Sequence, residues 1–171
     1  MIREYEERNV YDAFMERLKL IFEEFDNIYI SFSGGKDSGL LLNLVLDYRK
    51  AHYPGKTIGV FHQDFEAQYT VTTEYVERTF ERIRDEVEPY WVCLPMATRT
   101  ALSSYEMYWY PWDDKKQELW VREMPKHEYV INLENNPIRT YRYKMHQEDL
   151  AKQIGSAREA VSRILKQMVK K

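Results

Sequence analysis

The segment 31–38 brings glycine, hydroxyl, ammonium and carboxyl groups together within eight residues. It consists of Ser31, Phe32, Ser33, Gly34, Gly35, Lys36, Asp37 and Ser38. The two glycines let the backbone approach a ligand closely. The serine hydroxyls can donate hydrogen bonds and the lysine adds a positive charge, so these groups are suited to holding an anion. Asp37 is the one acid in the segment, and it suggests a Mg²⁺ ion bound together with phosphates.

The residues on either side predict a strand before this segment and a helix after it. Residues 28–30 are a short β-branched and aromatic run, which is typical of a buried strand. Residues 40–46 are mostly apolar, which predicts a helix packed on a sheet. In such an arrangement the free N–H groups of the loop and of the first helical turn point at the ligand, and the helix dipole favours negative charge. We therefore expect a nucleotide phosphate site; the alternative is an ordinary glycine-containing turn.

Helix and strand signals alternate along the first part of the chain. They predict a helix over 9–25, a strand over 28–32, a helix ending near Tyr48, a strand over 57–62, a helix over 67–87 and a strand over 90–94. This order implies an α/β fold with a doubly wound parallel sheet. Residues 96–137 are less regular and rich in aromatics, which fits either a lid or a substrate or partner surface. We place the nucleotide-binding domain at 1–138 and a basic helical tail at 139–171.

Two acids follow the second predicted strand. Asp64 and Glu66 come directly after it, and ligands of open parallel sheets bind at the carboxyl ends of the strands. We predict that Asp64 and Glu66 contact ribose hydroxyls or Mg²⁺ of the same nucleotide. The alternative is an acid pair at the start of the next helix, where the helix dipole favours negative charge.

The glycine-containing segment resembles a known family signature. Its Ser-Gly-Gly-x-Asp-Ser pattern is similar to the PP-loop of the ATP-pyrophosphatase and phosphoadenosine-phosphosulfate (PAPS) reductase superfamily, whose fold is adenine nucleotide alpha-hydrolase-like. Segments 29–38, 64–69, 91–95 and 119–123 together resemble the IbrA-type subgroup of the PAPS reductase family. The resemblance implies an ATP or PAPS-like adenine nucleotide and a role in activating prophage-borne genes. It covers roughly residues 8–145 of a family with longer members, so we expect a truncated member.

The cysteine content separates the chemical branches of that superfamily. A PAPS reductase needs a nucleophilic cysteine near its C-terminus, and no cysteine follows Cys93 in this chain. Cys93 lies in an apolar run, where a small buried thiol is expected rather than a reactive thiolate. We therefore expect neither sulfonucleotide reduction nor an iron–sulfur cluster. An ATP pyrophosphatase that adenylates a substrate stays open, as does a nucleotide sensor without turnover.

The C-terminal region carries a second pattern, which predicts DNA binding. Residues 139–171 hold nine Lys/Arg and three Asp/Glu, a net charge of +6, whereas residues 1–138 hold 16 and 25, a net charge of −9. Residues 147–166 have the apolar spacing of a helix-turn-helix, with Gly155 at the turn. The stretch resembles the DNA-reading helix pair of Crp/Fnr-type regulators. The predicted DNA contacts are Arg158, Glu159, Ser162, Arg163 and Lys166. The alternative is an amphipathic helical hairpin that packs on the sheet.

The overall composition is that of a soluble folded protein. The chain has 171 residues, a net charge of −3 and 31% charged residues, which excludes an extensively disordered chain. No stretch has the apolar length of a membrane span, and the N-terminus carries no apolar secretion segment. We expect a cytoplasmic protein that forms a homodimer or binds a partner protein. Three functions are weighed: a nucleotide-binding regulator directed to DNA, an adenylating enzyme, and a remodelled domain that keeps only the fold.

Overall fold

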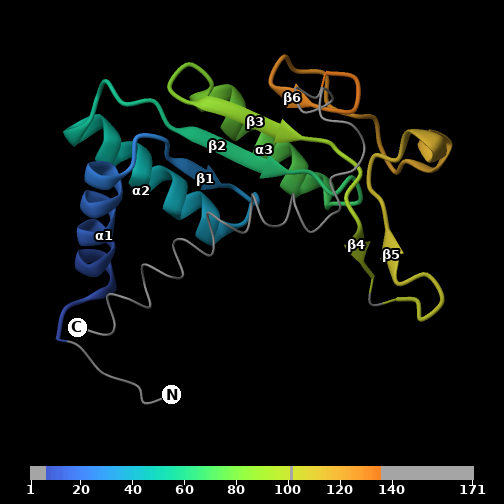
Figure 1. Ribbon diagram of the computed structural model, residues 1–171, viewed down its shortest axis with the longest axis horizontal. Helices are drawn as coiled ribbons and strands as arrows, with labels where there is room; N and C mark the ends of the chain where they lie inside the picture. Colours follow the sequence, from blue (N-terminus) through green and yellow to red (C-terminus); the bar gives the residue numbers. More distant parts are fainter. Residues whose placement is uncertain (1–6, 101, 136–171) are drawn as a thin grey trace.

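A four-stranded parallel sheet forms the centre of the computed structural model, which describes residues 7–100 and 102–135. The strand order is β1-β2-β3-β6, and every neighbouring pair is parallel. The strands are β1 (Tyr29–Ser31), β2 (Gly59–Gln63), β3 (Glu88–Val92) and β6 (Val130–Ile131). The predicted α/β fold with a parallel sheet is confirmed (Figure 1). The doubly wound arrangement stays a prediction, and the C-terminal hairpin and the DNA contacts lie outside the described residues.

Three helices precede the first three strands. They are α1 (Val10–Glu24), α2 (Lys36–His52) and α3 (Thr70–Ile83). The Asn9 side chain starts α1 by accepting a hydrogen bond from the Asp12 amide at 2.9 Å. Helix α2 runs four residues past its predicted end, because the turn residues Pro54 and Gly55 come only after His52. Helix α3 is shorter than predicted at both ends.

One face of the sheet packs on α2 and α3. Strand residues that share this face include Ile30, Val60, His62 and Trp91, each at most 5% exposed. The Phe80 ring of α3 lies 5.7 Å from the Trp91 ring, and apolar residues of α2 complete the core. On the other face, Tyr29 is 59% exposed. This alternation follows from the two-residue period of strands.

The irregular region 96–135 contributes more structure than the sequence predicts. Strands β4 (Thr98–Arg99) and β5 (Tyr108–Trp109) pair antiparallel, and a 3₁₀ helix, η1, spans Asp114–Leu119. The chain then returns to the main sheet and places β6 beside β3. Strand β6 escapes sequence analysis because two residues are too few to show a periodic pattern. No helix in the described part of the chain is long and apolar enough to cross a membrane.

Candidate functional site

The glycine loop, residues 33–38, joins β1 to α2 and is closed by its two serines. Ser33 Oγ lies 3.0 Å from Ser38 Oγ, and Ser38 Oγ donates to the Gly35 carbonyl oxygen at 3.0 Å. Gly35 is the residue that precedes the first turn of α2, and no side chain caps the helix there. The hydroxyls that the sequence predicts as ligand donors thus also hold the loop in shape.

The first turn of α2 leaves backbone donors free. The amide N–H groups of Lys36, Asp37 and Ser38 have no hydrogen-bond partner within the described residues. A helix start normally needs partners for these groups, and it carries a partial positive charge. The lysine and the aspartate are exposed, so solvent and small ligands reach this turn. These features are suited to an anion, and the binding of a phosphate here stays a prediction.

The two positions of the loop are occupied by glycine for different structural reasons. Gly34 has φ +79°, and a Cβ atom there would lie 2.7 Å from Val76 Cγ2 and 2.9 Å from Thr72 Cγ2. Because both the backbone angle and the contact with α3 exclude a side chain, Gly34 is needed for the fold. A Cβ on Gly35 would meet only Ser33 Oγ, at 3.4 Å, so the space above it is open to a ligand.

A buried histidine forms a hydrogen bond with the residue that precedes the loop. His62 Nδ1 lies 2.8 Å from the Phe32 carbonyl oxygen, and the side chain is fully buried. Burial lowers the pKa of His62, although the Phe32 carbonyl and Asp64 act in the opposite direction. The ring is therefore neutral at pH 7, with its Nδ1 proton donated to the carbonyl. This hydrogen bond fixes the end of β1 against β2.

Asp64 lies at the end of β2, as predicted, but it is fully buried and surrounded by protein donors. Its carboxylate accepts hydrogen bonds from the Glu66 amide at 2.7 Å and from Trp91 Nε1 at 2.7 Å. Arg122 Nη2 lies 2.5 Å and 2.6 Å from its two oxygens. The charge of the arginine compensates the buried carboxylate.

Glu66 is also nearly buried and has φ +61°, a conformation that is uncommon for residues with a side chain. Its carboxylate accepts from the Trp112 amide and from the Val121 amide, both at 3.0 Å. Arg122 Nε donates to its carbonyl oxygen at 2.9 Å. Both predicted acids thus attach the segment 112–122 to the edge of the sheet. Their contact with a nucleotide stays a prediction.

Sequence reasoning did not assign this attachment role to Arg122 and Trp112. The Arg122 guanidinium lies 4.9 Å from the centre of the Trp112 ring, and Trp112 Nε1 donates to the Asp64 carbonyl oxygen at 3.1 Å. Trp112 lies 48 positions and Arg122 58 positions after Asp64 in the sequence, so local patterns could not pair them with it. The signal that could have found Arg122 is its place in 119–123, one of the segments that carries the family resemblance.

Two residues discussed in the sequence analysis, Ser31 and Cys93, lie outside both the glycine loop and the acid pair. Ser31 belongs to β1 and is exposed on the sheet face opposite α2 and α3. Cys93 is buried, and burial together with the nearby Asp64 raises its pKa, so the thiol is unreactive, as expected. No group of three or more His, Cys, Asp or Glu within the described ranges is arranged to hold a metal ion.

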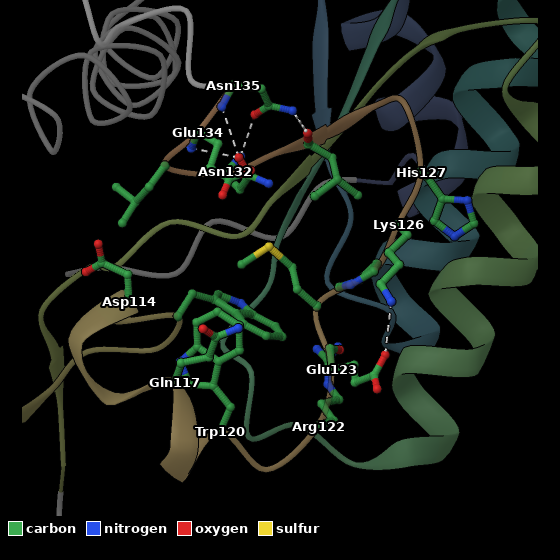
Figure 2. A pocket seen from close by; sticks show the side chains of 15 residues that line it. Asp114, Gln117, Trp120, Arg122, Glu123, Lys126, His127, Asn132, Glu134 and Asn135 are labelled. Atoms are coloured by element: carbon green, nitrogen blue, oxygen red, sulfur yellow. Dashed lines mark hydrogen bonds and ion pairs between the residues drawn. The ribbon is translucent and has the colours of Figure 1, made fainter.

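A pocket of about 760 Å³ lies next to the Asp64–Arg122 pair. Figure 2 shows Gln117 and Trp120 on one side of it and Asn132 and Asn135 on the other. Other residues of the segment 112–135 complete the lining, including Arg122, Trp112 and Met124. Aromatic and thioether groups share this lining with amide groups and with both acidic and basic side chains, so the pocket is mixed in polarity.

Comparison with known proteins identifies similarity in two parts of the chain. A family model described as bacterial regulatory proteins, crp family, matches residues 144–171. The uncharacterized protein YbdN of Escherichia coli is 39% identical over 119 residues, which are 69% of this chain and 28% of that protein. Sulfate adenylyltransferase subunit 2 of Photobacterium profundum is 38% identical over 66 residues, 38% of this chain and 21% of that protein. No solved structure shows a significant match.

The chain spans about a quarter of the length of these two curated relatives. The similarity to a Crp-type helix-turn-helix confirms the predicted resemblance at the C-terminus. The similarity to the adenylyltransferase subunit supports the predicted relation to adenine nucleotide enzymes. The IbrA-type subgroup and the assignment of individual site residues stay predictions.

Gly34→Ala tests the contact between the glycine loop and α3. We expect the free energy of unfolding to fall by at least about 1–2 kcal/mol, the usual cost of a left-handed backbone at a residue with a side chain. The clash with Thr72 and Val76 adds to this cost. Gly35→Ala is the matched control and should cost less, because its backbone is extended and only the weaker capping preference of alanine is lost. Urea unfolding of both variants is the measurement, and equal effects would contradict the distinction.

Arg122→Met tests the attachment of the segment 112–122. The variant keeps an unbranched side chain but leaves the buried Asp64 carboxylate without its counter-charge. We expect a loss of about 3–5 kcal/mol in the free energy of unfolding. Arg122→Lys retains the charge without the two-pronged geometry and should lose less. A wild-type urea midpoint for Arg122→Met would show that Asp64 does not depend on this pair.

Proposed function

We propose that this chain is a PP-loop protein of the PAPS reductase family, IbrA-type subgroup, which binds an adenine nucleotide and acts on gene regulation through DNA. The observation that carries the proposal is the start of α2, where three backbone amides have no partner within the described residues and belong to the last three residues of a Ser-Gly-Gly-Lys-Asp-Ser sequence. Ser31, Ser33, Gly34, Gly35, Lys36, Asp37 and Ser38 form the proposed phosphate site. A regulator of this kind acts in the cytoplasm.

The phosphates bind the amides of the first turn, and the Lys36 ammonium adds a cation beside them. Asp37 is exposed, and its carboxylate has no partner within the described residues. One carboxylate together with phosphate oxygens is a common way to hold Mg²⁺, so Asp37 fits a Mg²⁺–nucleotide complex. The ion would neutralise phosphate charge.

In this proposal Asp64 and Glu66 act indirectly, by holding the segment 112–122 against the edge of the sheet. A direct contact of Asp64 with ribose requires Arg122 or Trp91 to give up a hydrogen bond. A direct contact of Glu66 requires the same of the Trp112 or Val121 amide. We therefore assign nucleotide affinity mainly to the glycine loop, and to the two acids the position of the neighbouring segment.

Two similarities support the nucleotide and the DNA parts of the proposal separately. One relative is named as a sulfate adenylyltransferase subunit, and an adenylyltransferase handles an adenine nucleotide. The Crp-family match covers all five residues predicted to contact DNA, Arg158, Glu159, Ser162, Arg163 and Lys166. We divide the chain accordingly into a nucleotide-binding domain at 1–138 and a DNA-binding tail at 139–171.

A second function, an ATP pyrophosphatase that adenylates a substrate, is favoured by the pocket beside Arg122. The proposed nucleotide site and this pocket lie on either side of the Asp64–Arg122 pair along the order of the sheet. An adenylating enzyme needs a site for an acceptor molecule as well as one for ATP. Release of pyrophosphate from ATP in the presence of a candidate acceptor would favour this function over the regulatory one.

Gly35→Val tests nucleotide binding without disturbing the fold. The backbone at Gly35 is extended, with φ −83° and ψ 164°, which valine adopts readily, and its side chain would fill the space above the loop. We expect calorimetric titration with ATP or PAPS and Mg²⁺ to show at least about tenfold weaker binding, a loss of roughly 1.4 kcal/mol. Gly55→Val is the control, because no atom lies within 4 Å of a Cβ there. Unchanged affinity in folded Gly35→Val would remove the loop from the site.

Replacement of Arg158 or Arg163 tests DNA binding. If each side chain reads a base, its change to Ala should cost about 1–3 kcal/mol and relax specificity at one base pair. Lys166→Ala should weaken binding to all sequences alike and reduce the salt dependence, because lysine is expected to contact phosphate. Fluorescence anisotropy with duplex DNA over a range of salt measures both effects. Binding that is absent at low salt, or unaffected in the Arg158/Arg163 double variant, would show that the tail does not read DNA.

A further inference from the structure

His62 is a fully buried ionisable side chain, and its hydrogen bond reaches the peptide bond that leads into the glycine loop. The Phe32 carbonyl oxygen accepts from His62 Nδ1 at 2.8 Å. The N–H group of the same peptide bond belongs to Ser33, and it donates to Ser38 Oγ at 3.3 Å. Because a peptide bond is planar, fixing its carbonyl group also fixes the direction of its N–H group. His62 therefore acts on a hydrogen bond that closes the loop.

The hydrogen bonds of the loop continue in the same direction. Ser38 Oγ donates its own proton to the Gly35 carbonyl oxygen at 3.0 Å, so the hydroxyl is an acceptor for the Ser33 amide. Each group between His62 and Gly35 thus accepts a hydrogen bond at one end and donates one at the other. Hydrogen bonds arranged in this way polarise and strengthen one another. The chain of hydrogen bonds ends at the residue that precedes α2, whose first three amides belong to the proposed phosphate site.

The other ring nitrogen, His62 Nε2, is buried and has no well-aligned hydrogen-bond partner within the described residues. The side-chain oxygen of Gln68, Oε1, is buried in the same way. Burial lowers the pKa of the His62 ring, and the Gln68 side chain lies close enough to the ring to act in the opposite direction. A buried polar atom without a partner costs stability, and here two such atoms belong to neighbouring side chains.

Rotation of the Gln68 amide, so that its nitrogen and oxygen exchange places, resolves both cases. Since Nδ1 carries the proton of the neutral His62 ring, Nε2 is an acceptor and needs a donor rather than an amide oxygen. After rotation the NH₂ group of Gln68 faces Nε2 and donates to it. The oxygen takes the place of the amide nitrogen, which is not among the buried atoms without a partner in the described part of the chain. The two ends of an amide have nearly the same shape, so the exchange requires no other movement.

We propose that His62 and Gln68 are positioning residues of the glycine loop. Gln68 keeps the proton of the ring on Nδ1, and the ring holds the entry of the loop in the shape that binds phosphate. This role rests on the proposed function, because it concerns the same phosphate site. His62 is fully buried, so it acts through the backbone between Phe32 and Ser38. The alternative is that His62 only fills space in the core, where its ring lies 5.4 Å from the Trp91 ring.

Two substitutions of His62 separate hydrogen bonding from packing. The amide nitrogen of asparagine is bonded to Cγ, as Nδ1 is, so His62→Asn keeps a donor for Phe32 but loses the ring. His62→Phe keeps a ring but loses the donor. Calorimetric titration of the full chain with ATP and Mg²⁺ should give nearly wild-type affinity for His62→Asn and at least about tenfold weaker binding for His62→Phe. His62→Phe that binds as tightly as His62→Asn would overturn the positioning role, whereas a wild type that binds no nucleotide would contradict the proposed function itself.

The tautomer of His62 tests the pair in the wild-type chain, without relying on the folding of a His62 variant. A long-range proton–nitrogen correlation spectrum at neutral pH should show a proton on Nδ1 and none on Nε2. Gln68→Met removes the amide but keeps an unbranched side chain, and it should weaken ATP binding by at least about threefold, the effect of one net hydrogen bond. Gln63→Met is the matched control, because Gln63 is also half-buried but contacts the Asp64 and Val92 carbonyl groups instead. A proton on Nε2, or equal ATP affinity of the two glutamine variants, would overturn the role of Gln68.

Discussion

The buried carboxylate of Asp64 is the constraint on which the carboxyl edge of the sheet depends. A fully buried charge is stable only when its oxygens are all hydrogen-bonded and an opposite charge lies beside it. The partners come from three parts of the chain: the Glu66 amide, the Trp91 indole and the Arg122 guanidinium. These partners fix β3 and the segment 112–122 relative to the end of β2. Without them the edge that borders both the glycine loop and the pocket would have no defined shape.

The same network explains two unusual backbone conformations. Glu66 and Trp112 both have positive φ, at 61° and 55°, and neither is glycine. Each is held by hydrogen bonds to the other segment: the Trp112 amide donates to the Glu66 carboxylate, and the Trp112 indole donates to the Asp64 carbonyl oxygen. Strained backbone persists where surrounding contacts over-determine it, and such positions are frequent at functional sites. The strain here lies between the two candidate ligand sites.

Local sequence patterns predict the first half of this structure well and the second half poorly. The strand, glycine loop and helix at 29–52 follow from an apolar run, two glycines and an amphipathic segment, all read within a few residues. Asp64 was predicted at the correct edge of the sheet, but its burial was not, because its counter-charge lies 58 residues away. Strand β6 was missed because its two residues are too few to show a periodic pattern, and its pairing with β3 joins residues far apart in the sequence. Periodicity reports which face of an element is buried, but not which remote side chain meets a buried charge.

The packing of Gly34 against α3 has a consequence for the thermodynamics of ligand binding. Because Thr72 and Val76 already occupy the space beside the glycine, the loop has its shape before any anion arrives. A preorganised loop loses little conformational entropy when it is occupied, so more of the interaction free energy becomes affinity. The same packing makes the loop sensitive to residues that never touch the ligand. Larger side chains at position 72 or 76 would displace the loop, and sequence variation on α3 would then tune affinity from outside the site.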